Sequence, residues 1–133
     1  MRRILTAVFL TLALSHAAPA DPAAIRGVIT DQIEAFKRDD FTQAFTHASP
    51  SIKGMFGTPE RFGQMVRNGY PMVWRPREVR FLDLREEDGR VLQRIVVTDQ
   101  AGGEHILEYA MIETENGWQI NGVTLLRGLG LAA

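Results

Sequence analysis

An apolar stripe near the start of the chain constrains the fold more than any other feature. It lies in the stretch from Pro22 to Phe45 and repeats at the i, i+3, i+4, i+8 spacing of one helical face, at Ile25, Val28, Ile29, Ile33 and Phe36. Ordering a helix costs about 1.5 kcal/mol for each residue, which burial of these side chains alone does not offset. The helix is therefore expected to form only where another layer covers its apolar face.

The covering layer is expected from the second half of the chain, where the apolar period changes to two after Arg77. Four segments alternate in this way, namely residues 77–85, 90–99, 104–113 and 118–126. Turn residues separate them at Asp88-Gly89, Gly102-Gly103 and Asn116-Gly117. Helices followed by strands predict an α+β fold, with N-terminal helices packed on a curved four-stranded antiparallel meander.

The connection between these two parts contains further helical signals. Residues 41–48 continue the apolar stripe as a short helix, and Thr58 followed by Pro59 is typical of the start of another helix, which Gly69 can close. Residues 51–57 contain two glycines and have no clean period. We expect them to form a loop whose Ile52, Met55 and Phe56 side chains fill the core.

Residues 1–20 have the features of a secretory signal peptide. Two arginines precede an uncharged apolar run, and Ala18 and Ala20 supply the small residues of a cleavage site. Cleavage after Ala20 leaves residues 21–133 as a single domain, in the periplasm or secreted. The alternative is a membrane anchor, but the run is about half the roughly 20 residues that span a bilayer. No stable membrane insertion is therefore expected after signal cleavage.

Composition excludes several kinds of partner and cofactor. Loss of Arg2 and Arg3 with the signal takes the formal net charge from −1 to −3, which disfavours nucleic-acid binding. The chain has no cysteine, so thiolate metal cages are impossible. His47 and His105 lie far apart in different elements. We expect no metal site and no cofactor, with His47 hydrogen-bonded in a loop and His105 at a strand end.

The alternation of the strands places apolar residues on both faces of the expected sheet. The outer face, away from the helices, would carry Leu82, Leu84, Leu92, Val96, Ile106, Ile112, Val123 and Leu125. A sheet that is apolar on both faces needs a second cover, so we expect a homodimer through the outer sheet face, where Glu108 could pair with Arg94 or Arg80. The alternative is that residues 126–133 fold back across part of this face.

The order of these elements and a set of residues resemble a known superfamily. The residues are Gln32, Ala35-Phe36, Asp40, Ala44-Phe45, Ser49-Pro50, Phe56-Gly57, Phe62, Met65-Val66, Tyr70, Arg75-Pro76, Tyr109, Met111, Trp118, Ile120 and Gly122-Val123. The chain resembles the nuclear transport factor two and ketosteroid isomerase-like superfamily, and more closely a bacterial exported family catalogued as a domain of unknown function. The resemblance implies a cone-like, cystatin-like topology with a pocket between helices and sheet, and frequent dimers. It implies no reaction, because the isomerase's catalytic groups have no match here.

Five polar side chains are the candidates for binding a ligand. Tyr70, Gln93, Tyr109 and Trp118 have hydrogen-bonding groups that could line a pocket, and the alternative is ordinary core packing. Arg75, beside Pro76 and Arg77, could grip an anionic ligand through paired hydrogen bonds, unless it belongs to a salt-bridged surface.

The catalytic residues, if there are any, are unknown from the sequence. Asp83 and Asp99 share the expected inward register, but both lie near turns, where aspartate usually serves turn geometry. The leading hypothesis is a non-catalytic exported domain that binds a small molecule or an envelope protein partner. The alternative is a lyase- or isomerase-type enzyme with a buried ionisable group, and a third possibility is a structural dimer with a filled cone.

Overall fold

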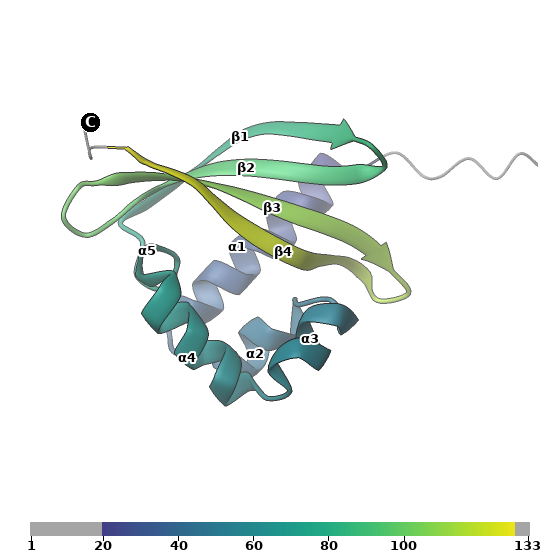
Figure 1. The fold of residues 1–133 in the computed structure, drawn as a ribbon, viewed down its shortest axis with the longest axis horizontal. Helices are drawn as coiled ribbons and strands as arrows, with labels where there is room; N and C mark the ends of the chain where they lie inside the picture. Colours follow the sequence, from purple (N-terminus) through teal and green to yellow (C-terminus); the bar gives the residue numbers. More distant parts are fainter. Residues whose placement is uncertain (1–19, 130–133) are drawn as a thin grey trace, which may run out of the picture.

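The computed structural model describes residues 20–129 and shows helices packed on one face of a twisted sheet (Figure 1). The helices are α1 (Pro22–Lys37), α2 (Phe41–Thr46), α3 (Pro50–Phe56), α4 (Pro59–Gly69) and α5 (Pro71–Trp74). The strands are β1 (Glu78–Glu87), β2 (Arg90–Thr98), β3 (Glu104–Thr114) and β4 (Gly117–Leu129), antiparallel in the order β1-β2-β3-β4. The predicted fold class is confirmed. The expected signal peptide lies almost wholly outside the described residues.

Side-chain caps fix where the helices begin. The Asp21 carboxylate accepts a hydrogen bond from the Ala24 amide at 3.1 Å, and Asp40 accepts one from Gln43 at 3.0 Å. The predicted cap Thr58 accepts from the Arg61 amide at 3.2 Å. Each of these bonds satisfies an amide that has no partner inside its helix.

The expectation of a loop at residues 51–57 is wrong, because α3 occupies most of this segment. The Ser49 hydroxyl caps α3 by accepting from the Ile52 amide at 3.2 Å, and Pro50 stands in the first turn, where its missing N–H costs nothing. Ser49-Pro50 therefore starts a helix. Ile52 and Phe56 pack against the core as expected, whereas Met55 is 70% exposed.

The segment between α2 and α3 runs along the edge of the sheet. The Ser49 amide donates to the Ile120 carbonyl at 2.8 Å, and the Ile120 amide donates to the His47 carbonyl at 2.8 Å. These two bonds form a parallel bridge between Ala48 and Ile120 of β4. Part of the β4 edge is therefore paired, and α3 is held beside it.

One hydrophobic core joins the helices to the inner face of the sheet. Phe62 of α4 lies at the centre of an aromatic cluster, with ring centroids 5.9 Å from Phe36, 5.2 Å from Phe45 and 5.7 Å from Phe56. The expected stripe of α1 is buried at Ile25, Ile29, Ile33 and Phe36. The sheet contributes Ile95, Val97, Leu107, Tyr109, Met111 and Ile120.

The expected outer face of the sheet is partly wrong, because β-bulges change which residues lie on it. The register shifts between Phe81 and Leu84 in β1, and β4 gains an extra residue at Asn121. An extra residue reverses the alternation beyond it. Leu84 and Val123 therefore pack toward the core, and Leu125 pairs with the core residue Leu107.

The remaining outer face is smaller than expected and partly polar. Leu92 and Val96 are already buried there, with 3% and 4% of their surfaces exposed. Glu108 accepts hydrogen bonds at 2.8 Å from both Arg94 and Arg85 of the same chain, whereas its pairing was expected across an interface. Residues 126–129 continue β4 and do not fold back, and residues 130–133 lie outside the described part.

Candidate ligand pocket

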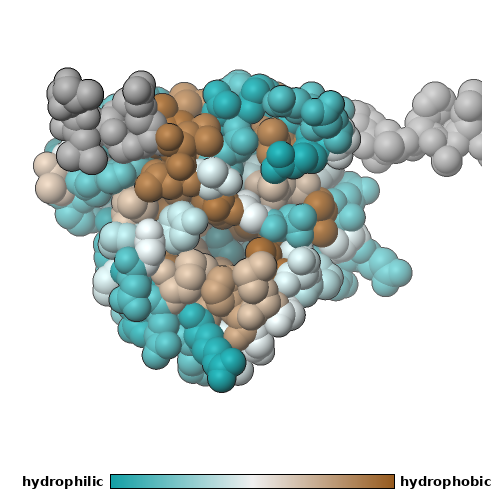
Figure 2. Space-filling view, viewed as in Figure 1, coloured by the Kyte–Doolittle hydropathy of each residue, from teal (hydrophilic) through white to brown (hydrophobic). Residues whose placement is uncertain are grey.

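A pocket of about 330 Å³ opens between the helices and β4. Figure 2 shows the pocket as a hollow near the middle of the molecular face in view, bordered mainly by hydrophobic residues. Its lining comes from α1, α3, α4, α5 and the strands β3 and β4, and consists of Gln32, Phe36, Ala48, Ile52, Met55, Phe56, Phe62, Met65, Val66, Tyr70, Val73, Tyr109, Ile120, Asn121, Gly122 and Val123. The cone is therefore not filled by side chains, which argues against the purely structural alternative.

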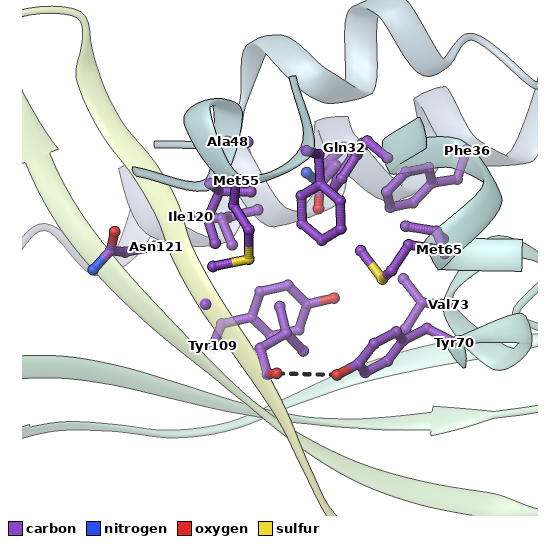
Figure 3. A pocket seen from close by; sticks show the side chains of 16 residues that line it. Gln32, Phe36, Ala48, Met55, Met65, Tyr70, Val73, Tyr109, Ile120 and Asn121 are labelled. Carbon is purple, nitrogen blue, oxygen red and sulfur yellow. Dashed lines mark hydrogen bonds between the residues drawn. The ribbon is translucent and has the colours of Figure 1, made fainter. Parts of the chain in front are cut away.

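Tyr109 presents a hydroxyl to this pocket from the inner face of β3. The side chain is 1% exposed, and its hydroxyl makes no hydrogen bond to any residue that the structure describes. Figure 3 shows the hydroxyl pointing into the space between the two methionines and Tyr70. Burial raises the pKa of the Tyr109 phenol well above its ordinary value, and the neighbouring Tyr70 adds to the shift. Tyr109 therefore stays neutral at physiological pH.

Tyr70 lines the same pocket from the junction of α4 and α5. Its hydroxyl donates to the Val123 carbonyl of β4 at 3.2 Å, drawn as a dashed line in Figure 3. The bond links the helical layer to the strand across one side of the pocket. The structure therefore brings together two of the five candidate residues, Tyr70 and Tyr109.

Gln93 lies outside the pocket, in the sheet beside the β1 bulge. It is fully buried, and its side-chain amide donates to the carbonyls of Leu82 at 3.1 Å and Arg94 at 2.8 Å. The β1 bulge leaves carbonyls without ladder partners, and this amide supplies one. Gln93 therefore stabilises the sheet beside the bulge, and it does not line the pocket as expected.

Arg75 also lies outside the pocket, although its expected paired hydrogen bonds are present. Its guanidinium donates to both carboxylate oxygens of Asp39, at 2.9 and 3.0 Å, and to the Phe36 carbonyl at 2.8 Å. Trp74 donates its indole N–H to the same carboxylate at 2.9 Å. The anionic partner of Arg75 is therefore the Asp39 carboxylate of the same chain, just after the end of α1.

Trp118 faces a different hollow, together with His47 and Lys53. It packs partly against the core. His47 does not hydrogen-bond through its ring Nε2, which is buried without a partner among the described residues, and burial lowers its pKa. Trp118 therefore lines a hollow separate from the pocket that contains Tyr70 and Tyr109.

The remaining titratable candidates serve turns and the surface. The Asp99 carboxylate accepts from the amides of Ala101 and Gly103 and lies 2.7 Å from His105 Nε2. These bonds, led by that to His105, lower its pKa. Asp83 is exposed. Within residues 20–129, no three His, Asp or Glu side chains are grouped to hold a metal ion.

Sequence reasoning missed Gln32 as a pocket residue. It is 3% exposed, and its side-chain amide donates to the Ala44 carbonyl at 3.1 Å. The signal was present in the sequence, because Gln32 occupies the i+7 position of the apolar stripe that begins at Ile25. A polar residue on a buried helical face needs a partner or a role.

The comparisons with known proteins place the chain in a family. Residues 18–133 match the family described as "Domain of unknown function (DUF4864)". The chain belongs to this family. The DUF4864 match confirms the resemblance seen in the sequence. No curated protein matches the chain.

Two solved structures are similar to this DUF4864 chain. An NTF2-like protein of unknown function from Shewanella baltica aligns with a TM-score of 0.50 and 15% identity, over 79% of this chain and 93% of that one. A phospholipid-binding protein from Ralstonia solanacearum, solved in complex with a phospholipid, aligns with a TM-score of 0.48 and 18% identity, over 78% and 76% of the two chains. The first likeness shows that the fold is NTF2-like.

Proposed function

We propose that this domain is a non-catalytic binding protein for a small, largely apolar molecule. The observation that carries the proposal is the apolar pocket of about 330 Å³ with the unpartnered hydroxyl of Tyr109 inside it. Ligand pockets usually measure about 300–1,000 Å³ and combine an apolar lining with a few polar groups. The pocket fits the lower end of that range.

The character of the lining supports binding over catalysis. Among the described residues that line the pocket, no side chain is Asp, Glu, His, Lys or Arg. A lyase or isomerase working through this pocket needs a group that can take up a proton near neutral pH. Tyr109, with its raised pKa, is a poor base for that task. An all-neutral lining is sufficient for a binder.

The proposal places the protein in the periplasm or outside the cell. It is supported by the arginines, the short apolar run and the small-residue exit of residues 1–20. Within residues 20–129, no helix has the length and apolar character needed to cross a bilayer. Detection of the protein in a periplasmic or culture fraction, with Asp21 as its first residue, would support this placement, whereas an intact N-terminus in the cytoplasmic fraction would contradict it.

The proposal also includes self-association through the outer face of the sheet. Its support is the pair Ile106 and Ile112, which stay on that face after the bulges are taken into account, beside the already buried Leu92 and Val96. Ile106 and Ile112 retain exposed surface. A protein partner on this face is the alternative to a second copy.

Thermal unfolding in the presence of a metabolite and lipid library tests the binding function. A ligand at about 100 times its dissociation constant stabilises the folded state by roughly 2.7 kcal/mol, which raises the midpoint by several degrees in a domain of this size. Hits among small apolar molecules are the expected result. Shifts confined to a charged substrate that is also turned over would favour the enzyme.

A further inference from the structure

The polar groups of the pocket are few, and each has a defined capacity. Gln32 reaches it from α1, Tyr70 from the α4–α5 junction and Tyr109 from β3. Figure 3 shows the three side chains around one space. Since the Tyr70 hydroxyl already donates its proton to the Val123 carbonyl, it can only accept from a ligand.

The hydrogen bond of Gln32 fixes which end of its amide is available. The Ala44 carbonyl can only accept, so the Gln32 nitrogen must face it at 3.1 Å. The amide oxygen, which accepts no hydrogen bond from the described residues, is the acceptor left for the pocket. Asn121 also lines the pocket, but its amide oxygen accepts from the Ser49 hydroxyl at 2.8 Å and its side chain points away from the central space in Figure 3. Tyr109 is then the group facing that space with a proton free to donate, together with lone pairs that can accept.

The charged side chains near the pocket do not line it. Arg75 is paired with Asp39, and Lys53 lines the neighbouring hollow. A carboxylate inside the pocket would therefore lose its hydration and gain no cation, while it faced the acceptor oxygens of Gln32 and Tyr70. A hydroxyl or primary amide group can instead donate to Gln32 or Tyr70 and accept from Tyr109.

We infer that the pocket selects uncharged apolar molecules bearing a hydroxyl or amide group, which Gln32 and Tyr109 bind, and that it rejects the corresponding carboxylate, which gains no cation there and faces acceptor oxygens. The inference rests on the proposed binding function and names its ligand class. It requires only that the ligand's polar group sits at the inner end of the pocket, where these two nearly fully buried side chains lie.

The test compares three molecules of one chain length, octan-1-ol, octanoate and octane. Each is titrated against the neutral fluorophore N-phenyl-1-naphthylamine bound to the protein purified after expression of the full chain. At about pH 8, octan-1-ol should displace the fluorophore at least about tenfold more effectively than octanoate. As the pH falls toward about 5, octanoate should improve because part of it becomes the neutral acid, whereas octan-1-ol should not.

The variants Tyr109→Phe and Gln32→Leu assign the selection to the named groups. Each should lower the ratio of octan-1-ol affinity to octane affinity by about 3- to 10-fold, the usual effect of one hydrogen bond. Using this ratio separates loss of the polar contact from any change in pocket shape. Where a variant fails to fold, the pH dependence of octanoate binding to the unaltered protein still tests the inference.

The outcomes separate this inference from the proposed function. If octanoate matches or exceeds octan-1-ol at about pH 8, the selection is overturned while a binding pocket stands. If both variants keep the full preference for octan-1-ol over octane, Gln32 and Tyr109 are not the groups that bind the hydroxyl. If the fluorophore does not bind and no molecule of the thermal library stabilises the protein, the proposed function itself fails.

Discussion

Asp39 links the end of α1 to the end of α5. It follows α1 in the left-handed region, with φ of 57°, and receives hydrogen bonds from Trp74 and Arg75. The Trp74 and Arg75 bonds lower the pKa of its carboxyl group from the ordinary value of 3.8. A lowered pKa means that the charged form stabilises the fold above pH 3.8, and that this contribution is lost as the pH falls through the folded-state pKa.

Asp39→Asn tests this contribution, because asparagine tolerates the left-handed conformation and keeps the size of the side chain. We expect the variant to have a lower unfolding midpoint at pH 7, since the charged bonds are weakened. Its stability should also change less with pH in the acid range below pH 3.8. Urea unfolding across that range measures both effects. Equal stability at pH 7 would contradict the role given to Asp39.

His47 makes the fold sensitive to pH near neutrality. Burial lowers its pKa from 6.5, opposed by Asp31 and assisted by Lys53, the charged groups that act on it. The His47 ring takes up a proton at higher pH in the unfolded chain than in the folded one. The free energy of unfolding is therefore highest above pH 6.5 and falls as the pH drops below that value. We expect His47→Gln to flatten stability between about pH 5 and 7, measured by thermal unfolding. An unchanged slope would contradict this.

Individual residues show what could and could not be read from the sequence. For Arg75 the structure shows the alternative, a salt bridge at the surface, with Asp39, which is 36 positions away and is brought close only by the fold. Gln93 looked like a pocket residue because nothing in the sequence marks the bulge that it serves. Gln32, in contrast, could have been recognised from its place on the buried stripe of α1.

Among the elements, α2 and α4 pack at a point where only glycine fits. A Cβ atom at Gly63 would lie 2.8 Å from the ring atoms of Phe41, closer than van der Waals contact permits. We expect Gly63→Ala to destabilise the protein by about 1–3 kcal/mol through overpacking, measured by urea unfolding. The matched control is Gly54→Ala in α3, where no atom lies within 4 Å.

The control should behave in the opposite way. Alanine in place of an open helical glycine stabilises a helix by about 0.5–1 kcal/mol. If Gly63→Ala proved as stable as Gly54→Ala, the close contact between α2 and α4 described above would be wrong.

The sequence predicted the elements better than it predicted their faces. The four strands and the capped α4 were expected from period and cap residues, and α3 was missed although Ser49-Pro50 resembles Thr58-Pro59. The predicted inner and outer faces of β1 and β4 are wrong beyond the bulge in each strand. A bulge depends on the pairing of two strands, and alternation within one strand does not show it.

At the scale of the whole molecule, the prediction to test is association of two copies through the outer sheet face. We expect sedimentation at micromolar concentration to show a dimer. Ile106→Glu should shift it toward monomer, because the substitution places a charge on that face without touching the core side of β3. A monomeric unaltered protein would contradict the expected interface and leave the pocket unaffected.

The pocket could be anticipated from the sequence only through resemblance. Its walls come from α1, α3, α4, α5, β3 and β4, and no local pattern records how these elements leave a space. Tyr70 and Tyr109 were candidates because each has an apolar ring with one hydrogen-bonding group. Met65 and Met55 were not, because an apolar side chain that lines a pocket has the same signature as one that fills a core.

The most direct measurement is binding of N-phenyl-1-naphthylamine to the unaltered protein and to Met65→Trp. Met65 lines the pocket from α4, so the larger indole should occupy part of the space. The control is Leu126→Trp, which adds the same group at a side chain that is 43% exposed and outside the lining. The account predicts fluorophore binding that Met65→Trp weakens by about tenfold or more while Leu126→Trp retains it. Equal binding by all three proteins would contradict a ligand site between the helices and β4.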